Sequence, residues 1–91
     1  MAHSLSSKKR IRQNEKHRFR NRVRRSRVKT QRRKFREAAA AGDVGVAEGE
    51  LRRAHKLIDQ VAAKGTIHKK AASRIKSRMQ RRLNRLAAAK S

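Results

Sequence analysis

The chain has 91 residues, enough for one small domain. Lys and Arg number 29 against 6 Asp and Glu, so the formal net charge is +23, while Val, Ile, Leu and Phe together number only 16. Few apolar residues and a high net charge are typical of a chain that needs a polyanionic partner to complete its structure. The lack of Cys excludes disulfides, thiolate nucleophiles and Cys-containing zinc sites. No apolar run reaches the roughly 20 residues of a membrane span.

Charge divides the chain into three blocks. Residues 8–36 carry 16 Lys or Arg and one acid, residues 37–63 carry three bases and five acids, and residues 64–91 carry ten bases and no acid. A nearly neutral middle segment therefore separates two basic arms. The Arg-rich, acid-poor start is similar to a mitochondrial transit peptide. The last block has the same basic character, which favours a protein that is basic at both ends over a transit peptide.

The first predicted element is a long helix over residues 7–41, preceded by a flexible N-terminus at residues 1–6. The chain has no Pro to interrupt it, and Gly42 is suited to end it in the left-handed conformation. At 1.5 Å per residue this helix would be about 52 Å long, so we expect it to extend on the order of 20 Å beyond its partners. Eleven bases and few apolar residues make residues 8–27 the overhanging part, which must face solvent or a polyanion.

Two further helices are predicted over residues 44–63 and 67–88. Asp43 is placed to cap the first of them, and Gly65-Thr66 repeats the same stop-and-start pattern before the second. Each carries one apolar stripe with helical spacing. The stripes are Ala47, Leu51, Ala54, Ile58 and Val61, and then Ile67, Ala71, Ile75, Met79, Leu83 and Leu86; on the first helix Val28, Phe35 and Ala38 or Ala39 share a face.

No segment alternates as a β-strand does, and residues with high β-propensity are few. The sequence therefore predicts an all-α fold, a three-helix bundle with a long overhanging first helix. Phe35 and Met79 are expected in its core. Phe19 is expected either against sugars of a polyanionic partner or against the end of the bundle.

The basic arms predict a nucleic-acid partner. A membrane-surface helix needs a wide apolar face, which residues 8–27 lack. Arg outnumbers Lys in the first arm, and its guanidinium suits bidentate contacts with phosphates and base edges. With two Phe and no Tyr or Trp, we expect recognition through backbone charge and folded shape rather than through stacked bases.

Neither a metal site nor a catalytic site is predicted. No two of the four His residues have i, i+4 spacing, and no Cys assists them. His17 and His68 are expected near RNA and His55 at a helix surface. A Ser-His-Asp site would need a pocket larger than a chain of this size is expected to form. The protein is therefore predicted not to be an enzyme and to need no cofactor.

Several segments resemble the bacterial small-subunit ribosomal protein S20 family along nearly the whole chain. They are Ser7-Lys8-Lys9-Arg10, Arg12-Gln13-Asn14-Glu15-Lys16, Arg20-Asn21, Arg25-Ser26-Arg27, Lys29-Thr30, Ala41-Gly42-Asp43, and Ala63 to Ala71 with Arg74, Lys76, Ser77 and Arg78. The resemblance implies one rRNA-binding helical domain over residues 1–91. It also implies a structural, non-enzymatic constituent of the small ribosomal subunit, located in the cytoplasm on the ribosome.

The partner implied by the resemblance is 16S ribosomal RNA, through its 5′ domain and the lower end of the long penultimate helix, bound directly and early in subunit assembly. No membrane partner and no homo-oligomer are expected. A non-sequence-specific DNA-binding or DNA-compacting protein is the alternative, and a cationic membrane-active protein is a third, less supported reading. The residues expected to contact RNA are Lys8, Lys9, Arg10, Arg12, Gln13, Asn14, Lys16, Arg20, Asn21, Arg25, Ser26, Arg27, Lys29, Thr30, Lys64, His68, Lys69, Lys70, Arg74, Lys76 and Arg78.

Overall fold

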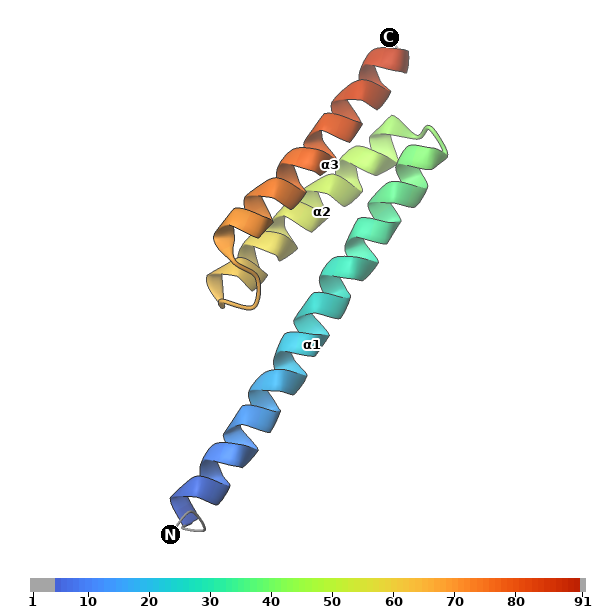
Figure 1. The fold of residues 1–91 in the computed structure, drawn as a ribbon. Helices are drawn as coiled ribbons and strands as arrows, with labels where there is room; N and C mark the ends of the chain where they lie inside the picture. Colours follow the sequence, from blue (N-terminus) through green and yellow to red (C-terminus); the bar gives the residue numbers. More distant parts are fainter. Residues whose placement is uncertain (1–4, 91) are drawn as a thin grey trace.

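The computed structural model describes residues 5–90, and all of the regular structure in this part of the chain is helical. Helix α1 spans Leu5–Ala40, α2 spans Val44–Ala63 and α3 spans Lys69–Lys90. The helices run up, down and up again (Figure 1). The all-α prediction is confirmed. Of the segment expected to be flexible, residues 1–4 lie outside the described residues, and residues 5 and 6 already belong to α1.

A left-handed glycine separates α1 from α2, as the sequence predicted. Gly42 has φ +74°, and its N–H donates to the carbonyl of Ala39 while that of Asp43 donates to the carbonyl of Ala38. These two bonds satisfy the last carbonyls of α1 in the Schellman arrangement. The Asp43 carboxylate accepts a hydrogen bond of 3.1 Å from the Val46 N–H, so the chain ends one helix and caps the next within two residues.

The turn between α2 and α3 ends one helix in the same way but starts the next one later than expected. Gly65 has φ +78°, and the Thr66 N–H donates to the Val61 carbonyl. The third helix begins at Lys69 rather than at residue 67. His68 provides the reason, because its Nδ1 accepts from the Lys70 N–H at 3.1 Å and so takes the capping position.

The core lies along one row of α2, with α1 and α3 packed on either side of that row. In Figure 1, α2 stands between the other two helices, and α1 and α3 contact each other much less than either contacts α2. Every residue of the stripe predicted for α2 is buried. The buried core consists of Val28, Phe35 and Ala38 from α1, Ala47, Leu51, Ala54, Ile58 and Val61 from α2, and Ala72, Met79 and Leu83 from α3.

The stripe predicted for α3 is only partly correct. Met79 and Leu83 are buried, but Ala72 takes the place expected for Ala71, and Ile67, Ile75 and Leu86 are half-buried beside the core. Steps of four residues turn about 40° further than one full helical turn. Three such steps carry a side chain well off the buried face, whereas Ala72, seven residues before Met79, returns to it.

The molecule is elongated because α1 is much longer than its partners. Its extents are 68 × 21 × 14 Å and its radius of gyration is 18.0 Å, against about 12 Å for a compact chain of this length. The 36 residues of α1 span about 54 Å. Every residue from Lys8 to Arg20 is exposed, and this part of α1 projects alone beyond the bundle (Figure 1). The free segment is thus shorter than the predicted 8–27, because Asn21 and Arg24 already contact the bundle.

Candidate nucleic-acid interface

The projecting part of α1, residues 8–20, presents seven bases and a single acid. Lys8, Arg12, Lys16 and Arg20 follow one another at spacings of four, so each lies next to the following one and the row winds partly around the helix. No ion pair within residues 5–90 involves this segment. Like charges four residues apart repel each other by a few tenths of a kcal/mol per pair, so an anion along this row would relieve an unfavourable arrangement.

Phe19 also belongs to the projecting segment. Its side chain is 64% exposed, and it lines a shallow surface hollow with Arg12, Glu15, Lys16 and Arg20. The ring therefore lies away from the end of the bundle, which leaves RNA as the partner expected for it. An apolar ring among Lys and Arg side chains suits the ribose surfaces that lie between phosphates.

The two basic arms meet where α1 leaves the bundle. The Thr66 hydroxyl, in the α2–α3 turn, donates to Asn21 Oδ1 at 2.8 Å, and Arg24 donates to the same oxygen at 3.3 Å and to Thr66 Oγ1 at 3.4 Å. Lys64, Lys69 and Lys70 flank this turn and are exposed. The fold thus brings together basic residues from segments about 45 residues apart in the chain.

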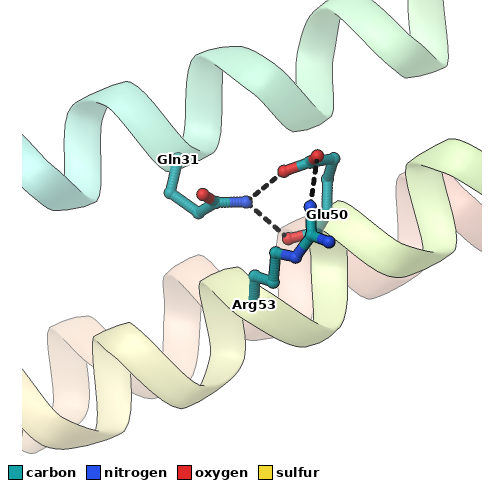
Figure 2. Close-up of polar contacts among 3 residues, drawn as sticks. All are labelled: Gln31, Glu50 and Arg53. Atoms are coloured by element: carbon teal, nitrogen blue, oxygen red, sulfur yellow. Dashed lines mark hydrogen bonds and ion pairs between the residues drawn. The ribbon is translucent and has the colours of Figure 1, made fainter.

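The acids of the middle block are largely used within the protein. Arg52 pairs with Glu48 at 2.6 Å, and Lys76 pairs with Asp59 at 2.7 Å. Figure 2 shows the amide of Gln31 directed from α1 at the Glu50 carboxylate, to which Arg53 also donates at 3.0 Å. The same amide donates to the Glu50 backbone carbonyl at 3.1 Å. The exposed side of α2 is consequently close to neutral, and most of the unpaired positive charge lies on α1 and α3.

Most of the residues predicted to contact RNA are exposed, but four of them have side-chain partners within the protein, among them Arg74, whose Nε donates to the Lys70 carbonyl at 3.4 Å. Asn21 is half-buried and accepts from Thr66 and Arg24. Lys76 is half-buried and paired with Asp59. His68 is exposed but caps α3. The exposed residues of the predicted set are Lys8, Lys9, Arg10, Arg12, Gln13, Asn14, Lys16, Arg20, Arg25, Ser26, Arg27, Lys29, Thr30, Lys64, His68, Lys69, Lys70, Arg74 and Arg78.

Sequence reasoning missed a group of bases that the fold brings together. Arg32 and Arg36 from α1 and Arg82 from α3 line one cleft with Arg78, around Phe35 and Met79. The spacing of Arg25, Lys29, Arg32 and Arg36 by 4, 3 and 4 residues was visible as a basic helix edge. Its proximity to α3 depends on tertiary packing and gives no local signal.

His55 differs from the expectation of a helix-surface residue. It is half-buried in α2, and its Nε2 is buried without a hydrogen-bond partner in the described structure. Over the same residues, no group of three or more His, Asp and Glu side chains is arranged to hold a metal ion. None of the helices described is both long and apolar enough to cross a membrane.

Comparison with known proteins points to one family. The family model described as Ribosomal protein S20 matches residues 2–84. The chain is 49% identical to the small ribosomal subunit protein bS20 of Corynebacterium kroppenstedtii, over 92% of this chain and 97% of that relative. It is 50% identical to the protein of the same name from Thermobifida fusca, over 94% of each chain, and 44% identical to that from Shouchella clausii, over 97% of this chain and all of the relative. With matches that cover nearly its whole length, this chain belongs to the ribosomal protein S20 family, a family of the small ribosomal subunit.

Proposed function

We propose that this protein binds the 5′ domain of 16S ribosomal RNA directly, also contacts the lower end of the long penultimate RNA helix, and promotes assembly of the small subunit. The observation that carries the proposal is the projecting segment of α1, residues 8–20, in which every side chain is exposed and seven bases have no acidic partner. A helix with bases on all sides gains most when phosphates approach it from more than one direction. RNA folded into adjacent helices provides that arrangement.

The junction at Asn21 and Thr66 supports the same function. It fixes the direction in which the projecting helix leaves the bundle and places Lys64, Lys69 and Lys70 beside its base. The bundle thus holds the projecting helix in position, while the basic arms supply the positive charge. Binding of this kind requires no chemical step, and the proposed role is structural.

The alternative function, non-specific DNA binding, rests on the same net charge of +23. It differs in its expected selectivity, because a general DNA-binding protein gains nothing from the tertiary fold of an RNA. Competition between a folded 5′-domain RNA and random duplex DNA at fixed salt separates the two functions. We expect the RNA to displace the DNA at a much lower concentration than the DNA displaces the RNA.

Hydroxyl-radical footprinting on full-length 16S RNA then locates the site. Protection is expected in the 5′ domain and in the penultimate helix, and reconstitution without the protein should delay formation of the 5′-domain structure. Equal competition by duplex DNA, together with a uniform footprint, would contradict the proposal.

A further inference from the structure

The cleft between α1 and α3 has a composition that the packing of the bundle does not require. Arg32, Phe35 and Arg36 line it from α1, and Arg78, Met79 and Arg82 line it from α3. Phe35 and Met79 are buried, with 1% and 6% of their surface exposed, so they form its base. Arg36 and Arg78 are exposed and Arg32 and Arg82 half-buried. The cleft therefore has an apolar base and is lined by four arginines, two from each helix.

The four arginines have no acidic partner. No carboxylate lines the cleft, and none of the ion pairs within residues 5–90 includes any of the four. Glu37, the acid nearest to them in sequence, pairs with Arg33 instead. Arg remains charged at all relevant pH values. Like charges from both helices thus line the cleft between α1 and α3, the two helices that make the weakest contact in the bundle.

We propose that this cleft binds a phosphate group of the RNA backbone and that the bound phosphate links α1 to α3. The proposal rests on the proposed function and deepens it by naming a second site, separate from residues 8–20. The cleft has a volume of about 120 Å³, which accommodates a tetrahedral oxyanion. Guanidinium groups on both sides match the oxygens of a phosphate with parallel hydrogen bonds.

The neighbouring surface shows how an RNA strand would reach the cleft. Arg25, Lys29, Arg32 and Arg36 are spaced by 4, 3 and 4 residues, so they lie along one edge of α1. A second hollow, lined by Lys29, Thr30, Arg32, Arg33 and Arg36, shares two residues with the cleft. The basic track therefore continues from the bundle end near Asn21 into the cleft.

Such a site has a distinctive consequence for the free protein. Without phosphate the four arginines repel each other across the α1–α3 contact, and with phosphate they attract a shared anion. Removing two of these charges should therefore stabilise the free protein and weaken RNA binding at the same time. Arginines that are merely solvated would show neither effect beyond that of net charge.

The test compares two double variants of equal charge. Arg36→Gln with Arg82→Gln removes one charge from each side of the cleft, whereas Lys56→Gln with Arg81→Gln removes two charges from exposed positions that do not line it. We measure affinity for 5′-domain RNA at fixed salt and the thermal unfolding midpoint at low salt. The cleft variant should bind RNA about tenfold to a hundredfold more weakly than the control, the loss expected for charged hydrogen bonds, and should unfold at a higher temperature than the control.

Inorganic phosphate provides a second readout. At equal ionic strength, phosphate should raise the unfolding midpoint of the unmodified protein and of the control more than chloride does, and this difference should disappear in the cleft variant. Equal RNA affinity of the two double variants would overturn the site, and a phosphate effect without any change in RNA affinity would mean an adventitious ion only. Either result leaves the proposed function intact if the unmodified protein still selects 5′-domain RNA, whereas loss of that selection would reject the function itself.

Discussion

The hydroxyl of Thr66 links the α2–α3 turn to α1 through Asn21, and no other side-chain hydrogen bond in the described structure spans so much of the sequence. Replacing Thr66 with Val keeps its shape and removes the donor. The Asn21 oxygen then keeps only its longer bond from Arg24. We expect a loss of about 1 kcal/mol in the free energy of unfolding, measured by urea denaturation. The matched control is Thr30→Val on the exposed side of α1; equal effects of the two substitutions would show that the Thr66 bond contributes nothing.

Two glycines respond in opposite ways to the same substitution. Gly49 lies inside α2, where an added Cβ would meet no atom within 4 Å. Gly49→Ala should therefore stabilise the protein by about 1 kcal/mol, the difference in helix propensity. Gly65 also has open space, but its φ of +78° is unfavourable for an L-residue. Gly65→Ala should destabilise the protein by about 1–2 kcal/mol. Thermal unfolding of both variants checks the pair, and destabilisation by Gly49→Ala would be inconsistent with the open space around it.

At the scale of elements, the sequence predicts what is local. The Gly42-Asp43 turn depends on neighbouring residues alone, and the α2 stripe mixes steps of three and four that keep it on one face. The predicted start of α3 was wrong because Thr66 has the residue type of a helix cap. Its hydroxyl instead bonds to Asn21, 45 residues away, which no local pattern shows.

The candidate site likewise has features that the sequence predicts and features that depend on tertiary packing. Charge blocks in the sequence predict which arms are basic, since net charge requires no knowledge of tertiary structure. They do not predict that Lys76 is paired with Asp59, or that Arg32, Arg36 and Arg82 share a cleft with Arg78. These relations arise only when α1 and α3 are packed on α2.

The projecting element gives a prediction about folding. Residues 8–20 bury no apolar surface against the bundle and carry repelling charges, so only intrinsic helix propensity supports their hydrogen bonds. Amide exchange in the free protein should be fast over this segment and slow around Leu51 and Ile58. Addition of 5′-domain RNA should slow exchange over residues 8–20. Strong protection of this segment without RNA would contradict the prediction.

For the whole molecule, the distribution of charge separates a strongly basic side, which we propose contacts RNA, from a nearly neutral one, and the salt dependence of binding tests that proposal. One variant replaces Arg12, Lys16 and Arg20 with Gln and so removes three charges from the projecting helix. The control variant replaces Arg52, Arg53 and Lys56 with Gln and so removes three charges from the exposed side of α2. If each of the first three neutralises a phosphate, the slope of log affinity against log salt should flatten by about 2–3 units. The α2 variant should leave the slope nearly unchanged, because Arg52 and Arg53 pair with Glu48 and Glu50 and Lys56 lies in neither the cleft nor the projecting helix.

Both variants lower the net charge from +23 to +20, so a purely long-range field predicts equal changes in slope. Direct phosphate contacts predict a change for the projecting helix alone, since only contacted phosphates release their counterions. Equal flattening in the two variants would therefore reject direct contact by residues 8–20 and reduce the role of the long helix to general attraction. A change confined to the projecting helix would mean that its length serves to carry charge beyond the bundle and place it between RNA segments that the bundle itself does not reach.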